Sequence, residues 1–545
     1  MVRFHPALTA LALLGLPQAV LAQDADGLVT EAREDGRRVA VQPYIEAAQV
    51  LGVELDPGND VFTYTRLAAG VDAAVVGARS AASASLRYER RIAYGDRQDA
   101  DTLSGVARGA LSLANRAVTL EAGALASRTN LGNGGVALPG AFGDVDNTTQ
   151  VYSVYAGPSV QFQAEDVLVQ GNYRVGYTRV DGPDAPVLAP GTADLDFYDD
   201  SVTHSASVRA SSRPYTILPV GLGVGAGWNE QHVSNFDQRI RDRYARVDVT
   251  AQLAPTVAAV AGVGYEDVEV SSRDALRDAD GVPIVGTDGR IVTDESGPRL
   301  IAYDTDGLIW DVGVMWRPST RTSLSATVGR RYGSMTYYGN FSYAPSARSS
   351  VSVSVYDSLT SFGGVLVNNL AALPTDFEAF RSPISGELVG CVISSEQGGC
   401  GLANFGSLRS AVFRNRGVTA SYSHNFGRMS AGIAGGFDRR RFIGAAGTPI
   451  AYADGVSDES AWLAAYARRQ IDEQSDLTAN ANVNWFDSGV EGEGSATGYS
   501  VSLAYYRRIL QDLTGTAAVG LDGITRDSLP DYKALSALLG LRYNF

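Results

Sequence analysis

From Arg38 onward, apolar and polar side chains alternate along the chain with a period of two. In residues 167–180 (VLVQGNYRVGYTRV), one set of alternate positions holds mostly valine and tyrosine, while the other holds mostly polar or charged residues. Residues 477–485 (LTANANVNW) alternate in the same way, with asparagines on the polar set. Successive side chains of a strand point to opposite faces. Each segment therefore predicts a strand with one apolar face and one polar or very small face.

About 22 segments of this kind follow one another, and many are longer than the ~5–6 residues of strands in soluble sheets. A tilted strand needs ~9–11 residues to cross the hydrocarbon of a membrane. The expected strands begin near residues 39, 63, 82, 101, 117, 148, 166, 200, 219, 239, 256, 304, 321, 334, 349, 410, 428, 458, 476, 494, 512 and 531.

The connections between these segments alternate in length. Short ones include 77–80, 254–256 and 318–320, and long ones include 271–303 and 359–409. Outer-membrane barrels have short periplasmic turns and long external loops. The predicted fold class is therefore all-β, a single antiparallel transmembrane β-barrel with both chain ends on the periplasmic side. A large β-sandwich is the alternative, but its strands are shorter and its loops need not alternate in length.

The first residues are typical of a secretory signal peptide. Arg3 precedes an apolar stretch at 7–16, and small residues stand before Gln23. That stretch is too short for a membrane anchor. We expect residues 1–22 to be the signal peptide, 23–38 a short periplasmic segment, and 39–545 the barrel. The protein is then expected in the outer membrane of a Gram-negative bacterium.

Composition narrows the function classes. The 545 residues carry 45 Lys and Arg against 60 Asp and Glu, a formal net charge of -15. Nucleic-acid binding requires a basic face, so we expect no nucleic-acid partner. No internal stretch has the ~18 apolar residues of a membrane-spanning helix, which excludes a helical membrane protein.

The C-terminal strand carries a specific pattern. Leu541, Tyr543 and Phe545 fall on its apolar face, and Leu538 is an apolar exception on the polar face. The ending resembles the terminal strand of Gram-negative outer-membrane barrels, whose last residue is typically Phe. The resemblance implies recognition by the barrel assembly machinery, with outer-membrane lipid and lipopolysaccharide as the surroundings.

Known barrel families can be compared with this pattern. A TonB-dependent transporter also has 22 strands, but its plug domain precedes the barrel, and here alternation begins near residue 39. Residues 330–359 resemble a hairpin of outer-membrane barrels linked to exopolysaccharide and exosortase systems. That resemblance implies a polysaccharide or a small solute as partner.

Charged residues at polar-face positions are the expected lining of the lumen. Such a lining either pairs its charges or creates a field across a pore. Pairing between neighbouring strands, such as Arg87 with Asp72 or Arg246 with Glu266, is the structural alternative. Inward Tyr244, Tyr338, Tyr356 and Tyr506 could offer faces to sugars. The expected lumen-lining residues are Arg66, Asp72, Arg87, Glu89, Arg91, Arg108, Glu121, Arg174, Arg209, Arg246, Asp248, Asp311, Arg331, Asp438 and Asp522.

Motifs for catalysis or metal binding are weak. No spacing makes His204, His232 or His424 the partner of a nucleophile. The acidic turns lack calcium-loop spacing. We therefore expect no catalytic residues, no cofactor and no metal. Cys391 and Cys400 are the only cysteines, and an exported chain would join them in a disulfide.

The sequence thus predicts a channel or export conduit for small or sugar-like solutes. A non-conducting structural or adhesion barrel with acidic external loops is the alternative, and an outer-membrane hydrolase is a weaker one. Because a plugless barrel of this size would be wide open, we expect residues 359–409 to fold into or across its mouth. Their apolar stretch at 362–373 would be out of place in an exposed loop. An external flap is the rival prediction. Substrate, direction of transport and oligomeric state stay open.

Overall fold

The computed structural model describes residues 38–95, 99–131, 136–139, 148–181, 200–286, 290–394, 398–399, 406–407, 409–491, 494–527 and 530–545. The predicted signal peptide and all but the last residue of the predicted periplasmic segment lie outside the described residues. The same is true of the proposed Cys391–Cys400 disulfide, since Cys400 is not among them.

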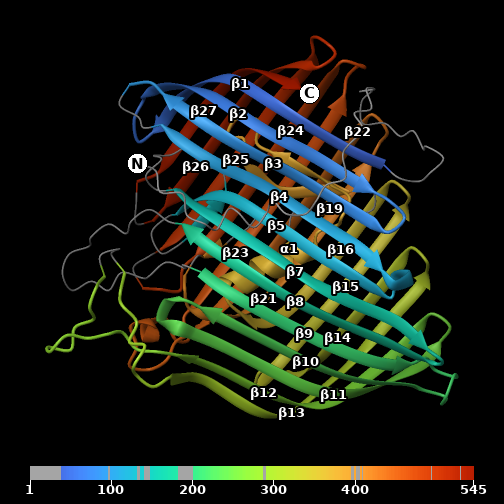
Figure 1. The fold of residues 1–545 in the computed structure, drawn as a ribbon. Coiled ribbons are helices and arrows are strands. Elements are labelled where there is room, and N and C mark those ends of the chain that lie inside the picture. The colour runs from blue at the N-terminus through green and yellow to red at the C-terminus, as the bar shows by residue number, and fades with distance from the viewer. Residues whose placement is uncertain are drawn as a thin grey trace. The chain divides into compact units, whose positions relative to one another are not determined.

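Antiparallel strands form a closed ring of 22, because β27 pairs with β1 as well as with β26 (Figure 1). This confirms the predicted fold class and strand number. The ring strands are β1 (Arg38–Asp56), β2 (Val61–Val76), β3 (Ser80–Ala93), β4 (Ala100–Leu113), β5 (Val118–Leu131), β7 (Thr148–Ala164), β8 (Val167–Asp181), β9 (Asp200–Ser212), β10 (Gly221–Val233), β11 (Gln238–Ala254), β12 (Val257–Ser272), β13 (Leu300–Ser319), β14 (Thr322–Arg331), β15 (Ser334–Ser346), β16 (Ser349–Thr360), β21 (Val412–Asn425), β22 (Met429–Ile443), β23 (Ser457–Gln470), β24 (Ser475–Asp487), β25 (Ser495–Arg508), β26 (Leu513–Arg526) and β27 (Tyr532–Asn544).

The two faces of the ring have opposite character. On β3, Arg87 and Glu89 are buried at 4% and 3% exposure, whereas Leu86 and Tyr88 are 37% and 49% exposed. Polar side chains thus point into the ring and apolar ones point outward, the reverse of a soluble protein. The outer surface offers apolar contacts to its surroundings, as the alternation predicts.

The alternation of connection lengths is not strict. The β9–β10 connection, at the end of the ring with the short turns, comprises residues 213–220, whereas at the other end β14 and β15 are joined by Tyr332 and Gly333 alone. Gly333 adopts a left-handed φ of +64°, which glycine accommodates without strain. β14 is also the shortest ring strand, at 10 residues. Two-residue turns of this kind close a hairpin tightly, so the rim is low between β13 and β16.

Inward aromatic rings lie flat on the wall because glycine stands opposite them. Tyr244 on β11 pairs with Gly227 on β10, and a Cβ on that glycine would lie 2.3 Å from the ring. Tyr356 and Gly417 repeat the arrangement between β16 and β21, with a corresponding distance of 2.4 Å. Glycine thus makes room for bulky side chains on the inner wall, so that they take less of the lumen.

The β16–β21 connection, residues 361–411, is called the plug below. It contains α1 (Phe362–Ala372), β17 (Phe377–Arg381), β18 (Leu388–Ser394) and the two-residue strands β19 (Gly398–Gly399) and β20 (Gly406–Ser407). Short β6 (Val136–Pro139) pairs with β20 and with β5. The remaining helices are single 3₁₀ turns, η2 (Ala114–Arg116), η5 (Asn235–Asp237) and η6 (Pro449–Ala453). No helix among the described residues is long and apolar enough to cross a membrane.

Candidate functional site: the lumen and its plug

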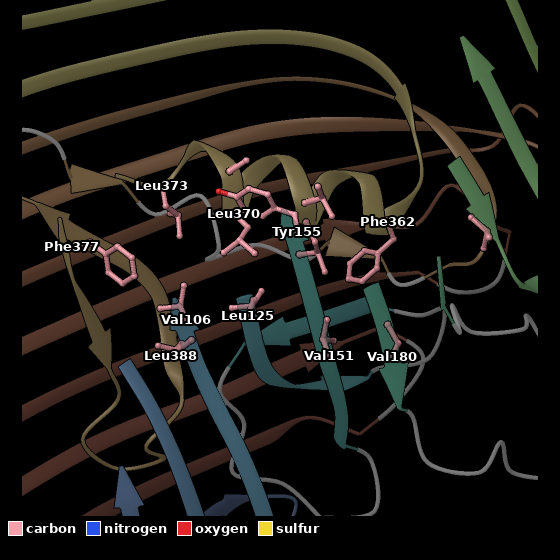
Figure 2. Close-up of a cluster of buried hydrophobic side chains, with 14 residues drawn as sticks. Val106, Leu125, Val151, Tyr155, Val180, Phe362, Leu370, Leu373, Phe377 and Leu388 are labelled. Carbon is pink, nitrogen blue, oxygen red and sulfur yellow. The ribbon is translucent and has the colours of Figure 1, made fainter. Parts of the chain in front are cut away.

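The helix of the plug docks on the inner wall. Ser361 caps it by accepting a hydrogen bond from the backbone N–H of Gly364, and Leu366 and Leu370 are 2% and 0% exposed. They belong to one buried cluster with Leu125 and Val151, inward residues of β5 and β7 (Figure 2). Burying each such side chain contributes about 1.5–3 kcal/mol. The prediction that residues 359–409 fold into the barrel is confirmed, and the external flap is wrong.

A hairpin formed by β17 and β18 docks on β2 to β4, and its tip accepts hydrogen bonds from wall arginines. Arg66 Nη1 donates to the carbonyls of Pro383 and Ile384 over 3.1 and 2.6 Å. Arg91 Nη2 donates to the carbonyl of Ser385 over 3.0 Å. Backbone carbonyls of the plug thus satisfy guanidinium groups that the lumen wall leaves buried.

The hairpin also donates to the wall. Arg381, at the end of β17, donates from Nη1 to Ser104 Oγ over 2.7 Å and from Nη2 to the carbonyl of Ser85 over 3.1 Å. Arg381 Nη1 also donates to Gly386 within the hairpin, over 3.1 Å. One guanidinium therefore joins β3, β4 and both arms of the hairpin turn.

Carboxylates of the wall complete this cluster. Glu46 on β1 pairs with Arg66 at 2.5 Å and with Arg87 at 2.9 Å. Glu89 pairs with Arg87 at 3.1 Å and with Arg91 at 2.9 Å. Three wall arginines thus face two wall glutamates, and the carbonyls at the hairpin tip approach the surplus positive charge.

The opposite side of the hairpin touches the far wall. Phe380 stacks on Tyr466 of β23 with ring centroids 4.7 Å apart, and Glu378 pairs with Arg468 of the same strand at 2.9 Å. Ile384 is fully buried in a cluster that includes Leu538 of β27. Leu538, the apolar exception on the polar face of the last strand, thus belongs to the plug contact.

Beside the plug, the part of the lumen along β8 to β16 holds two adjoining cavities of about 240 and 100 Å³. Tyr244 and Arg331 line both. Arg331 pairs with Asp242 at 2.7 Å and with Glu266 at 3.3 Å. Its guanidinium also lies 4.4 Å from the centre of the Tyr244 ring.

The structure places the other expected lumen residues in ion pairs or hydrogen bonds on the inner wall. Arg174 is the one that reaches the plug helix, donating to Asn368 over 3.4 Å. Asp522 is buried, at 4% exposure. The ion pairs are Asp72–Arg542 at 2.8 Å, Arg108–Glu121 at 3.2 Å, Arg246–Asp311 at 2.8 Å, Asp438–Arg440 at 3.0 Å and Arg209–Asp248.

The individual pairs differ from those expected. Arg87 does not pair with Asp72 but with Glu46 and Glu89, and Arg246 pairs with Asp311 rather than Glu266. The alternation gives the face of a strand but not which of several neighbours an arginine reaches. The long side chain of an arginine can reach a carboxylate two strands away or one on its own strand.

Sequence reasoning missed several cluster members. Glu46 and Asp242 occupy inward-facing alternate positions of their strands, so the alternation could have identified them. The alternation gives no signal for Arg128, which falls on the opposite set of positions from inward Glu121 and Leu125, although the β5 ladder with β7 continues past it to Asn130. Arg128 Nη1 donates to Thr102 Oγ1 over 3.1 Å, and Arg128 Nε lies 3.6 Å from Glu387 Oε1 of the plug.

The described histidines His204, His232 and His424 lie within hydrogen-bond distance of Tyr173, Glu230 and Tyr422, respectively. His204 lies between Tyr173 and Trp228, with Nδ1 2.9 Å from the Tyr173 hydroxyl. Tyr173 is 37% exposed. Within the ranges that the structure describes, no group of three or more His, Cys, Asp or Glu side chains could hold a metal.

Comparisons with known proteins give a structural likeness only. No family model and no curated protein matches the chain, so the exopolysaccharide resemblance of residues 330–359 gains no support from them. Similar solved structures include the FrpB iron transporter from Neisseria meningitidis, with 10% identity over 92% of this chain and 82% of that one, TM-score 0.44. The ferric-catecholate import receptor Fiu from E. coli K12 has 12% identity over 95% and 82%, TM-score 0.42. The siderophore receptor PirA from Acinetobacter baumannii has 10% identity over 93% and 81%, TM-score 0.41.

Proposed function

We propose that the chain is an outer-membrane transport barrel, a conduit for small polar solutes, including sugar-like ones, that its own plug closes. The observation that carries this proposal is the plug. Hydrogen bonds and ion pairs hold it in the lumen, beside a polar cavity.

The two faces of the ring support a membrane location. Outward leucines and tyrosines such as Leu86 and Tyr88 are exposed, and the strands close on themselves. In hydrocarbon, every backbone N–H and C=O must be paired within the protein, and a closed ring satisfies this. The short turns would then face the periplasm and the long connections the outside.

Part of the plug contact consists of hydrogen bonds that water can replace, as a gate requires. A hydrogen bond to water replaces one to protein at a net cost of about 0.5–1.5 kcal/mol. The hairpin tip holds to Arg66 and Arg91 through such exchangeable bonds. The apolar contacts of α1 and Ile384 hold the plug more firmly, because opening would also lose their burial energy. A barrel of 22 strands encloses a wide lumen, which would be open if no segment occupied it.

Planar-bilayer conductance tests the proposal. Replacing residues 362–407 by a short Gly/Ser linker should raise single-channel conductance several-fold, because the linker leaves the lumen open. As a control, removing residues 278–285 from the β12–β13 connection should leave conductance unchanged. Both variants must show the heat-modifiable gel migration of a folded barrel.

The contrary outcome has a clear meaning. If the folded plug-replacement variant conducts no better than the wild type, the lumen is not the pathway. The non-conducting structural barrel with acidic external loops would then be the better account.

A further inference from the structure

We infer that the larger lumen cavity is a binding site for a neutral polyhydroxylated ligand of one or two sugar rings. The inference rests on the proposed function and specifies its substrate class. The cavity holds about 240 Å³, slightly below the ~300 Å³ at which sites for drug-sized ligands begin. Its wall comes from β8 to β11 and β16, and the plug helix adds Asn368.

Most side chains that line this cavity are neutral hydrogen-bonding groups. Asn172, Ser205, Ser207 and Asn229 supply amides and hydroxyls from three adjacent strands. Thr203 is 7% exposed, and its Oγ1 has no hydrogen-bond partner among the described residues. A buried hydroxyl without a partner is costly. A ligand hydroxyl can supply the missing bond, and a sugar offers several that both donate and accept.

The charges at the cavity exclude other ligand classes. Among the described residues that line it, Arg331 and Asp242 are the charged ones, and they pair with each other at 2.7 Å. Glu266 approaches the same guanidinium at 3.3 Å. An anionic ligand such as a ferric catecholate would need an uncompensated cationic group. The cavity offers none, and its carboxylate, Asp242, is already paired with Arg331, so it is not free to hold a cation.

The tyrosines at one end shape the site but do not offer a stacking face. Gly227 makes room for the Tyr244 ring on the wall, and the Arg331 guanidinium covers it at 4.4 Å. Tyr332 lies on the same guanidinium at 4.7 Å and donates to Asp242 over 3.2 Å. We therefore expect recognition through hydrogen bonds to the amides and hydroxyls, not through stacking on Tyr244.

Isothermal titration calorimetry on the full chain in detergent tests the inference. The probes are maltose, lactose and sucrose, with glucuronate and a ferric tris-catecholate as charged comparators. At least one neutral sugar should bind with a Kd between about 10 μM and 10 mM, an affinity suited to a few hydrogen bonds. Neither charged comparator should bind more tightly.

Variants locate the binding. Ser205→Phe fills the cavity and should abolish binding, whereas Thr203→Val removes one hydroxyl and should weaken it roughly three- to tenfold. Thr149→Val is the matched control, since Thr149 is also a buried threonine with an unpartnered Oγ1 but lies outside the cavity lining. It should leave the Kd unchanged.

Each other result overturns the inference. Absence of neutral-sugar binding, tighter binding of a charged comparator, or wild-type binding by Ser205→Phe would each do so. Conductance measurements distinguish a failure of the proposed sugar site from a failure of the proposed conduit. A plug-replacement barrel that conducts without any sugar site overturns the site alone, and a sugar-binding barrel that never conducts overturns the conduit alone.

Discussion

Arg66 on β2 donates a hydrogen bond of 2.6 Å to the backbone carbonyl of Ile384, a residue 318 positions further along the chain. The same guanidinium pairs with Glu46 on β1 at 2.5 Å. One buried side chain thus holds both the first strand pair of the ring and the tip of the plug hairpin. Removing the charge of Arg66 should loosen the plug hairpin more than it destabilises the ring, because the ring keeps its full ladder of backbone hydrogen bonds.

Arg66→Ala should therefore loosen the plug hairpin. The change removes two hydrogen bonds to plug carbonyls and leaves Glu46 with Arg87 alone. Breaking a buried ion pair costs about 3–5 kcal/mol. Trypsin should then cut after Arg381 many times faster than in the wild type. Arg542→Ala is the control, since its partner Asp72 belongs to the wall; equal cleavage of both variants would contradict the role of Arg66.

Ile384→Asp should open the lumen without any deletion. Ile384 is fully buried between the hairpin and the wall, and an unpaired carboxylate there carries a large desolvation cost. Single-channel conductance should rise toward that of the plug-replacement variant. Ile284→Asp places the same charge on a side chain that is 37% exposed and should change nothing. Wild-type conductance of folded Ile384→Asp would argue against a docked hairpin tip.

Plug docking should weaken as pH rises. Burial raises the pKa of Glu387 above its usual range, because the loss of hydration outweighs the attraction of Arg128 and Arg91. The docked hairpin thus favours the protonated carboxyl more than the released, hydrated hairpin does. The resulting stabilisation is present at low pH and is lost as pH rises from the ordinary glutamate pKa of ~4.3 through the raised one.

Tryptic cleavage after Arg381 measured between pH 5.5 and 8.5, corrected for the activity of trypsin on a denatured sample, reports this loss. Cleavage should increase with pH in the wild type. Glu387→Gln, which cannot ionise, should give a flat profile. A profile of the same slope in both proteins would assign the pH dependence to other groups.

Gly157→Ala should destabilise the barrel, because strands β7 and β8 approach closely there. A Cβ at Gly157 would lie 1.9 Å from the carbonyl oxygen of Tyr173. Forcing extra atoms into a packed site costs about 1–3 kcal/mol. The temperature at which the folded band converts to the unfolded one on a gel should fall. Gly171→Ala is the control, with its nearest atom 3.6 Å away, and should match the wild type.

Phe545→Ala should slow insertion into the membrane. Phe545 is 69% exposed, packs edge-on against Tyr543 at 5.1 Å, and donates its N–H to the carbonyl of Pro43 over 3.0 Å. Its side chain is thus free for recognition by the barrel assembly machinery. Pulse-labelled cells should accumulate unfolded, protease-sensitive chains. Phe426→Ala, in an exposed turn at 59%, is the control; normal assembly of Phe545→Ala would refute the terminal signal.

The strand pattern is where sequence and structure agree most closely. Strands expected near residues 148, 200 and 349 begin at Thr148, Asp200 and Ser349. The period of two is a local property, set by alternate side chains that must face either apolar surroundings or the lumen. It therefore fixes the strands, their faces and the ring without knowledge of distant residues. The apolar stretch at 362–373 likewise predicted a contact inside the barrel, whereas the reason for the Leu538 exception emerged only from the structure.

Tertiary structure alone decided the partners. Arg542 meets Asp72 only because ring closure places β27 and β2 on either side of β1. Arg66 meets Ile384 only because the plug enters the lumen, and the cavity beside Tyr244 exists only between the plug helix and the wall. The alternation along a strand determines which face each arginine occupies. Which acceptor it reaches depends on strand stagger and side-chain length, and these are set when distant segments close on one another.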